Sequence, residues 1–242
     1  MNLNNIIVYD FETTSKSPYN CMPSQLAAVA IDGRSLSIIE GSVFDSEIRP
    51  ILDDEEAIRQ GYAPIEDEAL EITHKTREGL AKAPELKEVW STFVDYISKY
   101  KTAKNNWGNP IRAGYNIVNF DNNIVNRLCQ KFGQWDNTWQ TQSIFHPIHN
   151  IDVMHDIWRV TENIRINSTN SISMDSIRDW LGMSKENAHD AKADIYDTAE
   201  IMIRFLKLYR GITNGSISCA KCDTKFKVKF EKALSTWRRP TL

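Results

Sequence analysis

The stretch IIVYDFETT, residues 6–14, places two acidic residues in an otherwise apolar run. The apolar residues predict a strand that is buried on both faces, as in the middle of a sheet. Asp10 and Glu12 are two residues apart, so on a strand their side chains point to the same face. Burying two like charges is costly unless a cation offsets them, and carboxylate oxygens suit Mg²⁺ or Mn²⁺. Taken alone, the pattern fits a strand end that emerges into water better than a metal site.

The composition of the chain is that of one globular domain, with or without an appendage. It has 242 residues, of which 41% are hydrophobic and 25% charged. No apolar run approaches the roughly 20 residues that span a bilayer, and MNLNN at the start is not a signal sequence. The four cysteines are spaced irregularly, so we expect a protein of the reducing cytoplasm, without disulfides and without a membrane partner. Cys219 and Cys222 form one C-x-x-C pair, which is either a turn between two strands or half of a zinc site completed elsewhere.

The charges are distributed unevenly along the chain. The net charge is −3, but residues 201–242 contain ten basic and two acidic residues, so this tail carries +8 and the first 200 residues carry −11. A basic tail on an acidic body suits a surface that contacts phosphates. A charged hairpin that keeps the protein in solution is an equally good interpretation.

The periodicity of apolar residues predicts an α/β layer fold, because three strands are followed by a helix, a strand and then mostly helices. Residues 52–71 are acidic and predict a solvated loop with a short helix, and residues 133–149 lack a period and predict a loop. A hairpin is expected after Gly211. The predicted strands are 3–12, 25–32, 36–49 and 111–115, and the predicted helices are 84–100, 119–132, 150–163, 174–183 and about 190–210.

Three further polar residues lie near the ends of predicted elements. Asp121 follows a short strand and begins a helix, where an aspartate often serves as the N-cap. Asp194 lies about one turn into the long helix that Asp190 would cap, and His189 precedes that cap. Each of these residues, taken singly, is explained by a structural role.

Taken together, these residues resemble the three motifs of the DEDDh 3′–5′ exonucleases, in the expected order and in the expected elements. The match covers roughly residues 5–205 and is similar above all to the exonuclease I branch, which degrades single-stranded DNA. The stretches that carry this similarity are GYNIVNFD (114–121), NIDVMHDIW (150–158) and NAHDAKADIYDTA (187–199). The residues that match the motifs are Asp10, Glu12, Asp121, His189 and Asp194.

The resemblance implies a ribonuclease-H-like (DnaQ-like) fold, in which helices flank a mixed five-stranded sheet. Residues 1–211 would form this exonuclease domain, and residues 212–242 a small basic appendage, expected to be a β-hairpin. The family uses two divalent ions, Mg²⁺ or Mn²⁺. By resemblance, Asp10 would bridge both ions, Glu12 and Asp194 would complete the shell of the first, and Asp121 would support the second. His189 would be the general base that takes a proton from the attacking water, which suits a side chain with a pKa near neutrality.

The resemblance also implies residues that bind the 3′-terminal nucleotide. They are Phe11, Thr13, His74, Asn116 and Phe120. Aromatic rings can stack on any base, although core packing explains Phe11 and Phe120 as well.

The implied activity is metal-dependent hydrolysis of single-stranded DNA from a free 3′ end, with release of nucleoside monophosphates. One alternative is an exoribonuclease or an enzyme that degrades short oligonucleotides, because the same site serves either sugar. Another is a catalytically inactive module that binds nucleic acid, which the presence of all five motif residues disfavours.

Overall fold

The computed structural model describes residues 3–163, 171–183, 190–213, 217–218 and 225–226. The chain divides into two compact units, Met1–Ala199 and Glu200–Leu242, and the division falls within helix α8 (Ala191–Thr213). In the second unit, β9 (Ile217–Ser218) pairs antiparallel with β10 (Lys225–Phe226). Cys219 and Cys222 lie outside the described residues. The domain boundary expected at residue 211 stays a prediction.

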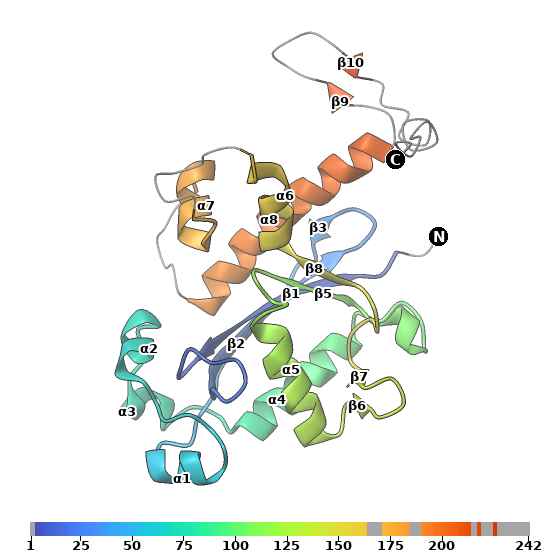
Figure 1. Ribbon diagram of the computed structural model, residues 1–242. Helices are drawn as coiled ribbons and strands as arrows, with labels where there is room; N and C mark the ends of the chain where they lie inside the picture. The colour runs from blue at the N-terminus through green and yellow to red at the C-terminus, as the bar shows by residue number, and fades with distance from the viewer. Residues whose placement is uncertain (1–2, 164–170, 184–189, 214–216, 219–224, 227–242) are drawn as a thin grey trace, which may run out of the picture. The chain divides into compact units, whose positions relative to one another are not determined.

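The first unit is built on a mixed sheet with β1 at its centre (Figure 1). One neighbour of β1 is β2, which runs antiparallel, and the other is β5, which runs parallel and is followed by the parallel β8. Both β3 and β4 pair with β2 on its far side, so the sheet is five positions wide, as predicted. The strands are β1 (Ile6–Thr13), β2 (Pro23–Asp32), β3 (Ser37–Ile38), β4 (Phe44–Glu47), β5 (Ile111–Gly114) and β8 (Asn150–Asp152).

Helices cover both faces of this sheet. Helices α4 (Leu86–Ser98) and α5 (Asp121–Phe132) lie on one face (Figure 1). Helices α6 (Val153–Thr161), α7 (Met174–Leu181) and the first two turns of α8 lie on the other. The remaining short elements are α1 (Asp54–Arg59), α2 (Asp67–Ile72), α3 (Arg77–Leu80), the 3₁₀ turn Asn106–Gly108, and a ribbon of β6 (Trp135–Asp136) and β7 (Thr141–Gln142).

The alternation of β1 divides its side chains between the two faces. Ile7, Tyr9 and Phe11 belong to the main hydrophobic cluster, which they share with α4 and α5. Asp10 and Glu12 therefore point to the opposite face, toward α6, α7 and α8. Burial of the apolar positions fixes the register of β1 and, with it, the direction of both carboxylates.

Two of the expected elements differ in the structure. The strand predicted at 36–49 is interrupted between β3 and β4, where Gly41 has a φ of +69°. There the backbone N–H of Ala30 donates to Ser42 Oγ at 3.2 Å, and this hydroxyl lies 3.3 Å from the Ala30 carbonyl oxygen, so a side chain replaces the sheet partner. The helix predicted at 150–163 begins only at Val153, because residues 150–152 form β8. Within the part of the chain that the structure describes, no helix is long and apolar enough to cross a membrane.

Candidate active site

Three parallel strands bring the polar residues of the chain to one edge of the sheet. Because β1, β5 and β8 run in the same direction, their carboxyl ends meet there. Asp10 and Glu12 lie at the end of β1, Asp121 begins α5 after the loop that follows β5, and Asp152 ends β8. This is the edge at which open α/β sheets bind their ligands.

Asp10, Glu12 and Asp194 form a compact carboxylate cluster. One oxygen of each lies within 4.8 Å of the others, and all three side chains are half-buried. Asp194 reaches the cluster from the first turn of α8. Three hard oxygen ligands at this spacing fit a divalent cation, and for such a cation the repulsion between the carboxylates becomes an attraction.

Burial and mutual repulsion change the acidity of the cluster in the absence of a cation. Burial raises the pKa of Asp10 well above its ordinary value, and the nearby Asp121, the largest of the neighbouring charges, raises it further. Burial, followed by the charge of Asp194, raises the pKa of Glu12 to about 8, although the ammonium group of Lys75 opposes this. A cation that binds near neutral pH would therefore displace protons from these groups.

Asp121 lies beside the cluster but is not one of its three members. Its side chain is buried, and its Oδ1 accepts a hydrogen bond of 3.0 Å from the backbone N–H of Phe11. Burial raises the pKa of Asp121 to about 7, even though this hydrogen bond lowers it. The next residue, Asn122, accepts a 2.7 Å bond from the Tyr9 hydroxyl, so β1 holds the start of α5 at two points.

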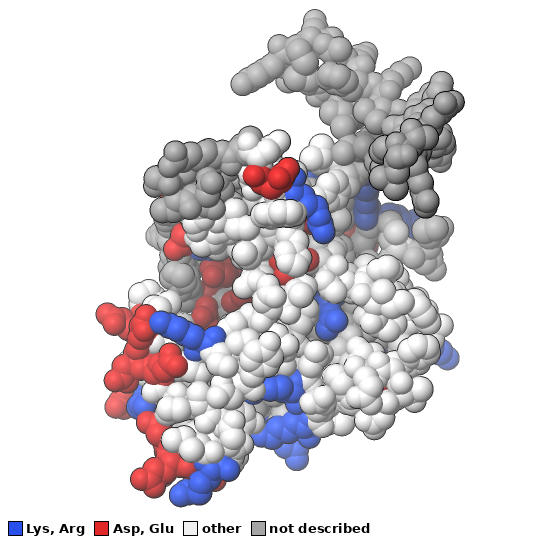
Figure 2. Space-filling view, viewed as in Figure 1, with Lys and Arg blue, Asp and Glu red and all other residues white. Residues whose placement is uncertain are grey.

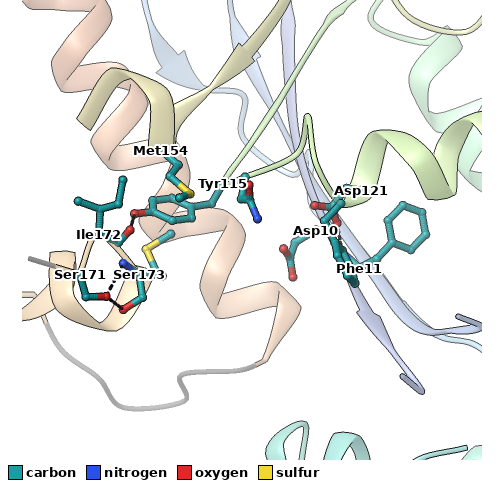
Figure 3. A pocket seen from close by; sticks show the side chains of 11 residues that line it. Asp10, Phe11, Tyr115, Asp121, Met154, Ser171, Ile172 and Ser173 are labelled. Carbon is teal, nitrogen blue, oxygen red and sulfur yellow. Dashed lines mark hydrogen bonds between the residues drawn. The ribbon is translucent and has the colours of Figure 1, made fainter. Parts of the chain in front are cut away.

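A cavity of about 500 Å³ opens next to Asp10 and Asp121. In Figure 3 these two carboxylates lie on one side of the cavity, and the labelled residues from Tyr115 to Ser173 lie on the other. The cavity also contains three of the residues predicted to bind substrate, namely Phe11, Asn116 and Phe120. Sequence reasoning did not identify the other lining residues, which are Tyr115, Met154, Ser171, Ile172, Ser173 and Met174.

The other predicted residues lie apart from this cavity or outside the described chain. Thr13 is buried, and its hydroxyl donates to the Ser15 carbonyl at 2.9 Å. His74 is exposed after α2, with a positive φ of 55°. His189 lies outside the described residues, so its role as the general base stays a prediction.

Asp152 organises the loop between β5 and α5. Its Oδ1 accepts from the backbone N–H groups of Asn116 at 3.0 Å and Met154 at 3.1 Å, and its Oδ2 accepts from that of Val118 at 3.1 Å. Asn116 has a φ of +58°, a conformation that non-glycine residues adopt at a cost. The sequence did mark this role indirectly, because an aspartate directly before a helical run is typical of an N-cap.

Two buried cations near the cluster were also missed. Lys75 is 9% exposed in its side chain, and its Nζ donates to Gln25 Oε1 at 2.7 Å. Arg178 is 1% exposed and binds Asp194. Basic residues within a loop and a short helix normally indicate a solvated surface, so nothing in the sequence identified either one.

Acidic side chains dominate the surface around the site. Figure 2 shows them gathered over α1, α2 and α3, with further acidic atoms inside a hollow beside these helices. A polyanion that approaches this site needs cations to offset the field.

A mixed sheet with helices on both faces and carboxylates at the carboxyl edge of its parallel strands defines a ribonuclease-H-like nuclease. The chain belongs to the RNase_T exonuclease family, whose model matches residues 7–202. The predicted fold and family are thereby confirmed, and the protein is a nuclease of the hydrolase class, from a family that uses divalent metal ions.

Solved structures agree on the fold. Exonuclease I of E. coli with a dT13 oligonucleotide superposes with a TM-score of 0.62 at 21% identity, over 88% of this chain and 44% of the other. Exonuclease I of Methylocaldum szegediense gives 0.63 at 19%, over 88% and 43%. The cell-death related nuclease CRN-4 gives 0.57 at 16%, over 86% and 65%. The chain thus spans less than half the length of these exonuclease I chains, and a search of the curated proteins finds no match.

Proposed function

We propose that the protein is a 3′–5′ exonuclease that hydrolyses single-stranded DNA with Mg²⁺ or Mn²⁺ and releases nucleoside monophosphates. The observation that carries this proposal is the cluster of Asp10, Glu12 and Asp194, whose oxygens lie within 4.8 Å of one another. Membership of the exonuclease family supports the reaction, and the E. coli exonuclease I structure with a dT13 strand supports the substrate.

The carboxylates of this chain fit two divalent ions in distinct roles. Glu12 and Asp194 would hold the first ion, Asp121 would support the second, and Asp10 would contact both. When bound, such a pair lowers the pKa of a water molecule and stabilises the charge on the leaving oxygen. Because Asp10 and Glu12 extend from a strand buried at the centre of the sheet, their oxygens are held at a fixed spacing.

The reaction breaks one bond and forms one. Water adds to the phosphorus of the last phosphodiester, with His189 accepting its proton, and the bond from phosphorus to the 3′-oxygen of the preceding nucleotide breaks. That oxygen takes up a proton, so the products are a nucleoside 5′-monophosphate and a strand shorter by one. Phe11, Asn116 and Phe120 would line the substrate pocket, and Thr13 and His74 would approach the terminal nucleotide from β1 and the loop after α2.

The direction of digestion is tested with strands blocked at either end. We expect a 5′-labelled single strand with Mg²⁺ to shorten one nucleotide at a time. A blocked 3′ end or EDTA should prevent this, whereas a blocked 5′ end should not. Cleavage of a circular single strand would contradict an exonuclease.

Parallel strands of DNA and RNA, single and duplex, test the substrate. Faster digestion of RNA would replace the proposed substrate with RNA. Binding of all strands without digestion of any would indicate an inactive binding module.

A further inference from the structure

Arg178 is a buried cation that connects two helices behind the carboxylate cluster. It lies in α7 with 1% of its side chain exposed, and each guanidinium nitrogen has its own aspartate. Nε donates to Asp197 Oδ2 at 2.7 Å, Nη1 to Asp175 Oδ1 at 3.1 Å, and Nη2 to Asp194 Oδ1 at 2.5 Å. A planar guanidinium fixes these directions in a way that a flexible ammonium group does not.

Fold stability alone does not require this arrangement. Desolvating a charge costs several kcal/mol, of which its partners return only part, and apolar residues of similar volume often replace buried ion pairs without loss. The bonds to Asp175 and Asp197 already satisfy two of the three nitrogens and connect α7 to α8. The third bond is different in kind, because its acceptor, Asp194, belongs to the carboxylate cluster.

We propose that Arg178 is a positioning residue, which holds Asp194 at the orientation in which it binds a divalent cation. This inference rests on the proposed metal-dependent function. Residues that bind a metal ligand from behind commonly fix its orientation, and losing such a contact lowers metal affinity about 10–100-fold. An ionised carboxylate has about four acceptor sites, so a bond from Arg178 is compatible with binding of a cation to the same side chain.

The charge and the geometry of Arg178 act on a cation in opposite directions. Its positive charge repels a bound cation, so removing the charge alone would strengthen metal binding. Its bonds hold Asp194 in place, so removing them would weaken metal binding. Arg178→Met removes both the charge and the bonds, and Arg178→Lys keeps the charge while losing the fork. The proposal requires that both substitutions weaken binding.

The test is titration of the full-length protein with Mn²⁺ by calorimetry, without nucleic acid. We expect the dissociation constant to rise about 10–100-fold in Arg178→Lys and in Arg178→Met. Asp197→Ala is the matched control, because it removes the other bond between Arg178 and α8 but does not touch the cluster. Its affinity for Mn²⁺ should equal that of the wild type, even if its melting temperature falls.

Several outcomes would overturn the proposal. One is an unchanged or tighter affinity in Arg178→Met, and another is an equal loss in Asp197→Ala, which would indicate a structural role only. If Arg178→Met does not fold, Arg178→Lys decides in the same way. Failure of the proposed nuclease activity is distinguishable, because a wild type that binds Mn²⁺ but digests no strand leaves the role of Arg178 intact. A wild type that binds no Mn²⁺ refutes both.

Discussion

Glu12 and Asp121 are single residues whose ionisation affects the whole fold. Burial raises the pKa of Glu12 from 4.5 to about 8, and that of Asp121 from 3.8 to about 7. A carboxyl group with a raised pKa binds more protons in the folded state than in the unfolded state. Its contribution to stability is therefore largest at low pH and is lost as the pH rises through the folded value.

We expect the metal-free protein to lose stability between about pH 4.5 and pH 8, to the extent that these groups dominate. Glu12→Gln should flatten this decline, because an amide does not ionise. Thermal unfolding in EDTA at a series of pH values measures the effect. A wild type that gains stability over this range, with no difference from Glu12→Gln, would show that the carboxylates are not mutually destabilising.

Divalent cations should reverse the same effect. At pH 8 we expect Mg²⁺ or Mn²⁺ to raise the melting temperature of the wild type, because a ligand that binds only the folded state stabilises it. The increase should be largely absent in Asp194→Asn, which loses one charge of the cluster. An equal increase in both proteins would place the cation elsewhere.

At the scale of elements, β8 and the loop after β5 depend on Asp152. Its carboxylate accepts three backbone hydrogen bonds, from Asn116, Val118 and Met154. Asp152→Ala leaves these donors without that partner, and each hydrogen bond to a charged group contributes about 1.5–3 kcal/mol.

We expect Asp152→Ala to lower the free energy of unfolding by at least about 1.5–3 kcal/mol, measured by urea denaturation. Asp136→Ala is the control, since Asp136 also accepts two backbone bonds, from Thr138 and Trp139, but in an exposed turn. Equal losses in the two variants would contradict the role of Asp152 in holding the loop.

Sequence periodicity predicted the elements that have a strong local signal. The central strand, the helices α4 and α5, and α7 with its end at Gly182 lie close to where they were expected. The strand β8 was missed because it has three residues and exists only by pairing with β5, a partner almost 40 positions earlier. The ribbon of β6 and β7 was missed for the same reason, since each strand has two residues.

The site follows the same rule. Alternation on β1 predicted the common direction of Asp10 and Glu12, and the motif resemblance supplied Asp121 and Asp194. Arg178 was missed because its three acceptors are set by the packing of α7 on α8, which no local pattern encodes.

At the scale of the whole molecule, the charge of the chain is divided between an acidic body and a basic tail of +8. If the tail contacts phosphates, Lys225, Lys227 and Lys229 should contribute to binding of a single strand. Replacing all three with glutamine should then weaken binding at low salt. The slope of log affinity against log salt should fall by up to about 2, at about 0.7 per phosphate contact.

Fluorescence anisotropy with a labelled strand in EDTA measures this slope without digestion. Hydrolysis of a dinucleotide is the control and should not change, because so short a substrate spans little beyond the carboxylates. An unchanged slope would favour the alternative, a tail that keeps the protein in solution.

The central claim is that the carboxylate cluster is the metal site of a 3′–5′ exonuclease. The most direct measurement compares the wild type with Asp10→Asn on a 5′-labelled single strand of DNA in the presence of Mg²⁺, with circular dichroism to establish that both are folded. We predict a ladder of products shortened from the 3′ end for the wild type, and none for Asp10→Asn. An equal ladder from both proteins would contradict the account.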